Sequence, residues 1–354
     1  MYGEQMLSLL EELQLPRYGL SMYISPVEAQ QADALTKQQL DNLSRAGKRM
    51  MGFCKSTFFK RMDSSGFAFL LSLYRHILRN ALYIYALKEK LPIPIGDDNT
   101  MPEDYVEIEE TNILPVEEGE NVVSVNAQTG CLSVPTNMDT YMKKAQEYYN
   151  ILQNKSRAIR WIDPKYFKRT LKGELLKDCN ILLQMIELCG AWNPNNDQKL
   201  NKLENEILLG KHSNEKVLIF TQFADTAKYI YEQLKKRGRV KNIDYATGAS
   251  ENPTRLAERF SPKSNKASVA AENELRVLIA TDVLSEGQNL QDAHIIVNYD
   301  LPWAIIRLIQ RAGRVDRIGQ DADSIYCYSF FPAQGIEDII SLRGRLNKRI
   351  NENA

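Results

Sequence analysis

The spacing of apolar residues along this chain changes near residue 213. Before that point they recur at steps of three and four, as on one face of a helix. The clearest stretches are Ser56–Lys90, Met138–Asn154 and a helix expected to begin at Asp163-Pro164 and to end at Gly190. Aspartate caps a helix, proline fits its first turn, and glycine ends it. A mainly α-helical region is therefore predicted for the first 212 residues.

After residue 213, short apolar runs alternate with amphipathic stretches. Each run is suited to a strand that is buried on both faces. The runs are Lys216–Thr221, Ile243–Ala246, Val277–Ala280, Ile295–Val297 and Ile325–Phe331. Alternation of this kind predicts an α/β lobe, with a parallel sheet that carries helices on both faces.

Four parts are predicted along the chain. They are a basic helical region (1–92), an acidic linker with several prolines (93–137), a second helical region (138–212) and the α/β lobe (213–354). A short hairpin is expected within 122–134, where Gln128-Thr129-Gly130 could turn.

Charge is distributed unevenly although the formal net charge is zero. Between Asn42 and Lys90 there are ten Lys and Arg against two acidic residues, while Asp97–Glu120 holds ten Asp and Glu and no Lys or Arg. Anion binding by the basic region and ordinary solvated surface are both compatible with this pattern. Lys60 and Arg61 are candidates for a phosphate contact.

Five scattered cysteines form no C-x-x-C pair. This usage predicts reduced thiols in a cytoplasmic protein, without a disulfide framework or a protein-bound metal. The apolar runs are far shorter than the roughly 20 residues of a membrane span, and no secretion signal is recognisable. No membrane association is expected.

The stretch Gln310–Gln320 contains Arg311, Arg314 and Arg317 at steps of three. On a helix these would share one face, from which guanidinium groups could bind phosphate oxygens. A solvated basic helix end is the alternative. Polar pairs also follow three of the predicted strands, and parallel strands end at one edge, where ligands bind. These pairs are Thr221-Gln222, Thr247-Gly248 and Thr281-Asp282.

Four motifs in order resemble the second RecA-like lobe of superfamily-two helicases, and most closely that of bacterial SWI/SNF-related DNA translocases. They are Ile219–Phe223, Thr281–Gln291, Asn298–Trp303 and Gln310–Gln320. The resemblance runs from Lys216 to the C-terminus. The segment Lys60–Ser65 is similar to one that precedes this lobe in some bacterial relatives, several of which carry a phospholipase-D-like nuclease domain.

The resemblance implies that ATP with Mg²⁺ binds between two lobes and that the second lobe supplies arginine fingers, here Arg314 and Arg317. Arg311 would be a structural or nucleic-acid contact. Around the nucleotide it implies roles for Gln310, Glu286, Gly287 and Asn289. Contacts to the DNA backbone that do not read sequence are expected from Gln222, Thr247, Gly248, Thr281, Lys60, Arg61, Arg75 and Arg79.

The chain has no G-x-x-x-x-G-K-[ST] phosphate loop and no Asp-Glu-x-His box. The first lobe, which would hold most of the ATP and the Mg²⁺, is therefore expected in cis or in trans, and this chain alone should be inactive. The alternative function is a non-catalytic nucleic-acid or protein scaffold that uses the basic region 42–90. The Arg314 and Arg317 pair favours a motor.

Overall fold

The computed structural model describes residues 4–95, 124–126, 128–155, 160–284, 289–302 and 304–332. These residues form two compact units. A helical unit takes in most of the chain up to Trp192. The second unit, here called the sheet unit, begins at Asn193 and also includes Arg61–Ala68 and Asn126–Cys131. The borders therefore differ from those of the predicted lobe at 213–354.

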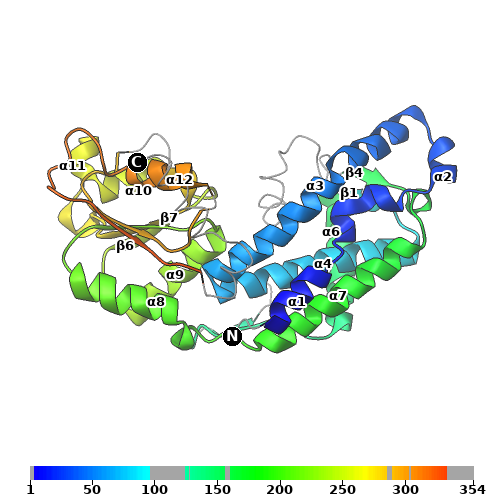
Figure 1. Cartoon of the computed structure of the whole chain (residues 1–354), viewed down its shortest axis with the longest axis horizontal. Helices are drawn as coiled ribbons and strands as arrows, with labels where there is room; N and C mark the ends of the chain where they lie inside the picture. The colour runs from blue at the N-terminus through cyan, green and yellow to red at the C-terminus, as the bar shows by residue number, and fades with distance from the viewer. Residues whose placement is uncertain are drawn as a thin grey trace. The chain divides into compact units, whose positions relative to one another are not determined.

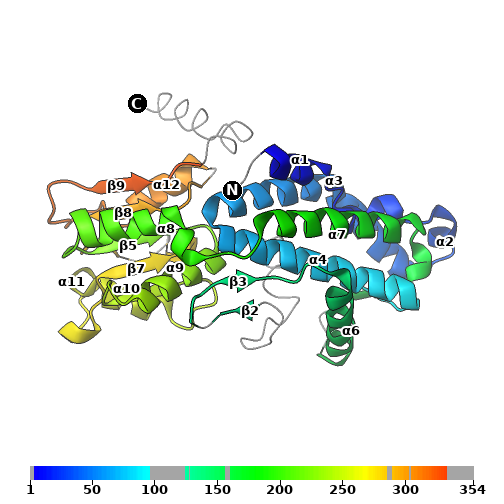
Figure 2. The same cartoon turned by 90° about the horizontal axis from the view of Figure 1, so that it is seen from below.

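The helical unit is built around two long helices, α3 (Ala34–Ser64) and α4 (Gly66–Glu89). Helix α4 is buried along most of its length, including its polar side chains Arg75, His76 and Arg79. Helix α7 (Thr170–Cys189) runs beside it (Figures 1 and 2). The remaining elements are α1 (Glu4–Glu12), η1 (Pro16–Tyr23), α2 (Pro26–Gln30), β1 (Ile93–Ile95), β2 (Ser124–Val125), β3 (Leu132–Ser133), α6 (Met138–Lys155), β4 (Arg160–Ile162), η2 (Pro164–Tyr166) and α7 (Thr170–Cys189).

The structure confirms several local predictions and corrects one. The hairpin exists, since β2 pairs antiparallel with β3 and Gly130 has a φ of 74°. Gly190 ends α7 as expected. Asp163 does not cap that long helix, because its carboxylate accepts the Lys165 N–H of the short 3-10 turn η2, and α7 begins only at Thr170. Most of the predicted linker lies outside the described residues.

The sheet unit contains a five-stranded parallel sheet in the order β6-β7-β5-β8-β9. Its strands are β5 (Val217–Phe220), β6 (Ile243–Ala246), β7 (Val277–Ala280), β8 (Ile295–Asn298) and β9 (Tyr326–Ser329). All five predicted strands are confirmed. Because β5, β7 and β8 are buried at every position, their apolar runs are continuous rather than alternating.

Helices cover both faces of this sheet, with α8 and α9 on one side and α10, α11 and α12 on the other (Figure 1). Side chains of β5, β7 and β8 on the second side pack with Ala257 and Phe260 of α10. The structure thus confirms the predicted RecA-like α/β lobe. The elements around the sheet are η3 (Pro194–Asn196), α8 (Gln198–Lys202), η4 (Leu203–Lys211), α9 (Ala224–Arg237), α10 (Pro253–Phe260), α11 (Pro262–Asn265), η5 (Ala271–Asn273), η6 (Asp282–Leu284) and α12 (Ile305–Ala312).

No helix in the described part of the chain is long and apolar enough to cross a membrane.

One buried histidine gives the helical unit a predictable response to acid. His76 on α4 is 3 % exposed and lies against the rings of Tyr18 and Phe58, with centroids 5.7 and 5.3 Å away. Burial holds the pKa of His76 well below its ordinary value of 6.5, and the charges of Arg17 and Arg79 add to this effect. The imidazole is therefore neutral in the folded protein.

Acidification is expected to destabilise the protein through His76. Below about pH 6.5 the unfolded chain binds a proton at this residue that the folded chain excludes, so the free energy of unfolding falls as pH falls. The contribution is at most about 1.4 kcal/mol per pH unit. Urea unfolding between about pH 7 and pH 5 should show a shallower loss of stability for His76→Phe than for the wild type. Equal slopes for the two proteins would contradict this assignment.

Candidate nucleic-acid and nucleotide interface

Three predicted threonines lie side by side at the carboxyl edge of the sheet. Ala246 of β6 and Phe220 of β5 both pair in register with Ala280 of β7. The next residues, Thr247, Thr221 and Thr281, therefore continue the row, and the Thr221 N–H donates to the Ala280 carbonyl at 3.0 Å. All three side chains are largely buried, so the exposed rim of this edge is formed by the residues that follow them.

Gln222 forms the rim beside Thr221 and is half-buried. Its backbone N–H donates to Oδ1 of Asp300 at 2.8 Å, and its side-chain amide donates to the Leu301 carbonyl at 3.0 Å. The amide has a second N–H, because a primary amide carries two donors. Gln222 is thus held in a defined orientation, and its second amide N–H could donate a hydrogen bond to a phosphate oxygen.

A tight turn forms the rim beside Thr247. The Thr247 N–H donates to the Ser250 hydroxyl at 2.9 Å, and the Ser250 N–H donates to the Thr247 carbonyl at 3.0 Å. Gly248 in this turn is exposed, and a Cβ placed on it would meet no heavy atom within 4 Å. The surface at Gly248 is therefore open to a ligand backbone. The structure brings Gln222, Thr247, Gly248 and Thr281 to one edge, as predicted.

The arginine stretch is not one helical face. Helix α12 ends at Ala312, and Arg314 and Arg317 lie in the turns that follow. The predicted spacing on one helix face is therefore wrong for these two residues. Glycine at 313 favours this early end, since glycine is a poor helix former. Arg311 is still helical and points inward rather than into a common clamp.

Arg311 is a structural residue of the sheet unit. Its side chain is fully buried, and Nε donates to Asp282 Oδ1 at 2.8 Å while Nη1 donates to Asn298 Oδ1 at 3.1 Å. The guanidinium carbon also lies 5.2 Å from the centroid of the Phe220 ring, within the range of a cation–π contact. These contacts join α12 to the ends of β7 and β8.

Arg317 is exposed, and its Nη1 donates to Asn289 Oδ1 at 2.6 Å. Arg314 is half-buried, and its carbonyl accepts the Leu290 N–H at 3.2 Å. The structure therefore brings Arg314, Arg317 and Asn289 together, whereas Gln310 lies half-buried on α12. Glu286 and Gly287, also predicted here, are outside the described residues.

Residues 198–319 match the family model of the helicase conserved C-terminal domain. The chain carries a helicase C-terminal lobe. The match confirms the resemblance to the second lobe of superfamily-two helicases.

The curated proteins that are similar to this helicase lobe are much longer than the matched region. The chain is 32% identical over 130 residues to "Uncharacterized ATP-dependent helicase YqhH" of Bacillus subtilis, a match that spans 37% of this chain and 21% of the relative. It is 30% identical over 150 residues to "ATP-dependent RNA helicase DBP8" of Debaryomyces hansenii, with 42% and 31% covered. "RNA polymerase-associated protein RapA" of Vibrio cholerae is 28% identical over 192 residues, with 54% and 17% covered. The chain thus matches about a sixth to a third of each relative's length.

Three arginines predicted to contact DNA are buried instead. Arg61 is 3 % exposed, pairs with Asp225 at 2.9 Å and lies over the Phe223 ring at 4.6 Å. Arg75 and Arg79 of α4 are 8 % and 3 % exposed. For Arg75 and Arg79 the prediction assumed that α4 has a solvated face, but this helix is enclosed, whereas Arg61 at the end of α3 is buried by its contacts with Asp225 and Phe223. The predicted DNA-backbone contact is therefore wrong for these three residues. Lys60 is half-buried, and its contact stays a prediction.

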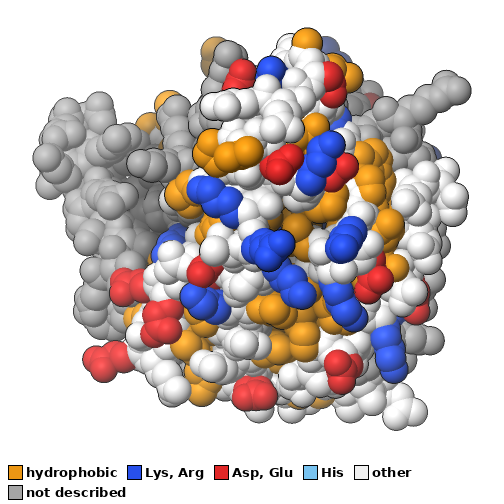
Figure 3. Space-filling view, turned by 90° about the vertical axis from the view of Figure 1, so that its right-hand side faces the viewer, with side chains coloured by type: hydrophobic (Ala, Val, Ile, Leu, Met, Phe, Trp, Pro, Cys, Tyr) orange, Lys and Arg blue, Asp and Glu red, His pale blue; other side chains and the backbone are white. Residues whose placement is uncertain are grey.

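The helical unit nevertheless has exposed lysine and arginine side chains. Its exposed cations include Lys165, Lys168, Arg169 and Lys172, which precede or begin α7. Figure 3 shows lysine and arginine side chains on one face, with apolar and acidic side chains among and around them. Arg61, Arg75 and Arg79, which were part of the basic region predicted from residues 42–90, therefore do not contribute to the exposed surface.

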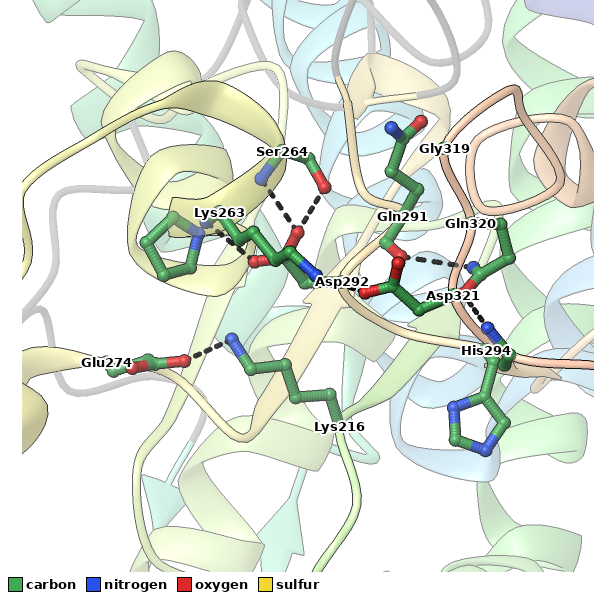
Figure 4. Close-up of a pocket in the computed structure, with 12 residues that line it drawn as sticks. Lys216, Lys263, Ser264, Glu274, Gln291, Asp292, His294, Gly319, Gln320 and Asp321 are labelled. Atoms are coloured by element: carbon green, nitrogen blue, oxygen red, sulfur yellow. Dashed lines mark hydrogen bonds and ion pairs between the residues drawn. The ribbon is translucent and has the colours of Figure 1, made fainter.

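A cavity of about 740 Å³ lies at the amino edge of the sheet, beside the starts of β5, β7 and β8 (Figure 4). Its charged side chains already pair with neighbours: Lys216 with Glu274 at 2.5 Å, and Lys263 with Asp321. Asp292 accepts the backbone N–H groups of Lys263 and Ser264, both at 2.8 Å. None of the predicted site residues that the structure describes lines this cavity, so we place the functional edge of the helicase lobe elsewhere.

Two aspartates organise the carboxyl edge and were not given roles from the sequence. Asp282 accepts hydrogen bonds from the side chains of Arg311 and Arg307, and Asp300 accepts one from the Gln222 N–H. Both stand inside the quoted motifs, yet their partners lie on other elements and are not visible as a sequence pattern. In the described part of the chain, no group of three or more His, Cys, Asp and Glu side chains is placed to hold a metal ion.

Proposed function

We propose that this chain is the second motor lobe of an ATP-dependent DNA translocase or helicase. The proposal rests on two polar features that the helicase lobe carries together. One is the row of Thr247, Thr281 and Thr221-Gln222 at the carboxyl edge of the sheet. The other is the turn that presents Arg317 beside Asn289.

The carboxyl edge is suited to the backbone of a nucleic acid. Amide, hydroxyl and backbone N–H donors bind phosphate oxygens and position a strand without reading its sequence. Gln222 and Gly248 are the rim residues that a strand can reach. DNA is therefore proposed to bind along this edge through its phosphodiester chain.

The arginine turn is suited to a nucleotide phosphate held by another lobe. Arg317 is exposed, and its hydrogen bond to Asn289 orients the guanidinium while leaving other N–H donors for a phosphate. We propose Arg314 and Arg317 as arginine fingers that neutralise charge on the γ-phosphoryl group of ATP. A first lobe, in cis or in trans, would bring the phosphate loop and the acids that hold Mg²⁺.

A glutamine-to-alanine change at the edge tests the DNA part of this proposal. Gln222→Ala is expected to weaken binding of a fluorescent DNA duplex by about tenfold, because a hydrogen bond to a charged group is lost. Fluorescence anisotropy should give equal affinities for two unrelated DNA sequences, since only the backbone is bound.

Lys235→Ala is the matched control for this measurement. Lys235 is exposed and lies near the end of α9, roughly 15–20 Å along the helix from Gln222. Its removal takes away a positive charge but should leave the DNA affinity within about twofold of wild type. Equal binding by wild type and Gln222→Ala, or a preference for an RNA duplex over DNA, would contradict the proposal.

A further inference from the structure

A segment far upstream in the sequence forms part of the sheet unit. Residues Arg61–Ala68, here called the junction segment, contain the end of α3, Ser65 and the start of α4. They lie outside residues 198–319, which match the helicase domain. Ser64 in this segment contacts Asp300, which follows 236 positions later in the chain.

Ser64 belongs to a fully buried polar cluster. Its hydroxyl donates to Asp300 Oδ2 at 2.6 Å and lies 2.8 Å from the Thr226 hydroxyl. Ser64, Thr226 and Asp300 are each 0% exposed. A carboxylate in such surroundings is stable only when protein donors replace the water that it has lost.

The other donors to Asp300 come from the carboxyl edge of the sheet. The Thr221 hydroxyl donates to the same Oδ2 as Ser64, at 2.5 Å, and the Gln222 N–H donates to Oδ1 at 2.8 Å. A carboxylate is planar, so fixing Oδ2 from one side also fixes the direction of Oδ1. Ser64 and Thr221 together thereby help to fix where the acceptor of the Gln222 N–H lies.

The junction segment is anchored on both sides of Ser64. Before it, Arg61 pairs with Asp225 at 2.9 Å. After it, the Phe67 ring stacks on Tyr229, with centroids 4.8 Å apart. Lys199 donates to the carbonyl groups of Asp63 and Ser64, at 2.7 and 3.3 Å. These contacts hold the Ser64 hydroxyl in place against the sheet.

We infer that Ser64 is a positioning residue for the DNA-backbone contact at Gln222, acting through Asp300. This inference rests on the proposed function for its DNA part. Its structural part, the control of the Gln222 backbone by a residue outside the helicase domain, stands without DNA. The helicase lobe of this protein is thus completed at its ligand edge by a short piece of the preceding helices.

Hydrogen exchange in the full chain, without DNA, tests the structural part. In Ser64→Ala, the amide of Gln222 should exchange about tenfold faster than in wild type, because its acceptor is no longer fixed. Ser65→Ala is the matched control. Ser65 is the adjacent serine, is also buried, and its hydroxyl has no hydrogen-bond partner within the described residues. It should leave the exchange rate within about twofold.

Two exchange results would overturn the inference. One is an unchanged rate at Gln222 in Ser64→Ala. The other is a uniform increase over all strands of the sheet, which would mean that Ser64 only stabilises the fold. A faster rate confined to residues 221–223 supports the inference.

A double-mutant cycle on duplex binding tests the DNA part. Ser64→Ala should weaken binding in the wild-type background and have no further effect in Gln222→Ala, because both changes remove one contact. Additive effects would overturn the coupling. If Gln222→Ala itself binds DNA like wild type, the proposed function fails at this edge, and the exchange result alone then decides whether Ser64 positions Gln222.

Discussion

If Arg317 is the proposed arginine finger, its replacement by alanine in the complete two-lobed motor is expected to lower DNA-stimulated ATP turnover by roughly 10³-fold or more. Arg317 is exposed and oriented by Asn289, so its loss removes a charge from the reacting phosphate without disturbing the core. DNA affinity should change little, because the proposed DNA edge is formed by other residues. The measurements are kcat for ATP hydrolysis and the dissociation constant for duplex DNA.

Arg307→Ala is the control for this prediction. Arg307 is an exposed arginine of the neighbouring helix α12, and it pairs with Asp282 at 3.0 Å. The same loss of one positive charge at this position should leave kcat within about threefold of wild type. Equal turnover by wild type and Arg317→Ala would show that Arg317 is not a finger. A motor without measurable turnover before mutation would favour the scaffold alternative.

Replacement of Arg311 by alanine is expected to lower the free energy of unfolding by about 3–5 kcal/mol, the usual cost of breaking a buried ion pair. Arg311 is fully buried and holds Asp282 and Asn298. Its removal takes one hydrogen-bond donor from each of these two acceptors inside the sheet unit. Urea unfolding, followed by circular dichroism, measures this change.

The same aspartate supplies the control, because Arg307 also pairs with Asp282 but is 51% exposed. Arg307→Ala should cost less than about 1 kcal/mol, as for other solvent-exposed pairs. Arg311→Lys should rescue little stability, since an ammonium group cannot reach two acceptors in the planar geometry of a guanidinium. Equal losses for Arg307→Ala and Arg311→Ala would contradict the structural role of Arg311.

The strands and their order along the chain could be predicted because burial on both faces leaves continuous apolar runs. Val217–Phe220 and Val277–Ala280 are examples, and both are buried at every position. Parallel pairing then places Thr221 and Thr281 at one edge, which follows from the α/β pattern alone. The candidate nucleic-acid edge could therefore be predicted with its residues.

The positions of the charged side chains could not be predicted in the same way. Arg75 and Arg79 stand on the polar side of an amphipathic pattern, but α4 is enclosed on that side too. Arg311 and Arg317 have the same residue type and similar neighbours, yet one is buried and the other exposed, because α12 ends between them. Such differences depend on tertiary packing, which helical spacing does not contain.

The contact between Ser64 and Asp300 was also beyond prediction. The two residues are 236 positions apart, and a lone buried serine has no periodic pattern. The similarity of Lys60–Ser65 to a segment in bacterial relatives marked the region without giving its role. Only the structure shows that this segment contacts the carboxyl edge of the sheet.

Hydrogen exchange of the full chain with and without a short DNA duplex tests the central claim most directly. The proposed motor lobe predicts slower exchange on DNA binding at residues 221–222, 247–248 and 281, equally for two unrelated sequences. Lysine-rich residues 165–172 and residues 69–90 of helix α4, which belong to the helical unit, should be unaffected. Protection confined to those helical residues, or no protection at the carboxyl edge of the sheet, would contradict the proposed function.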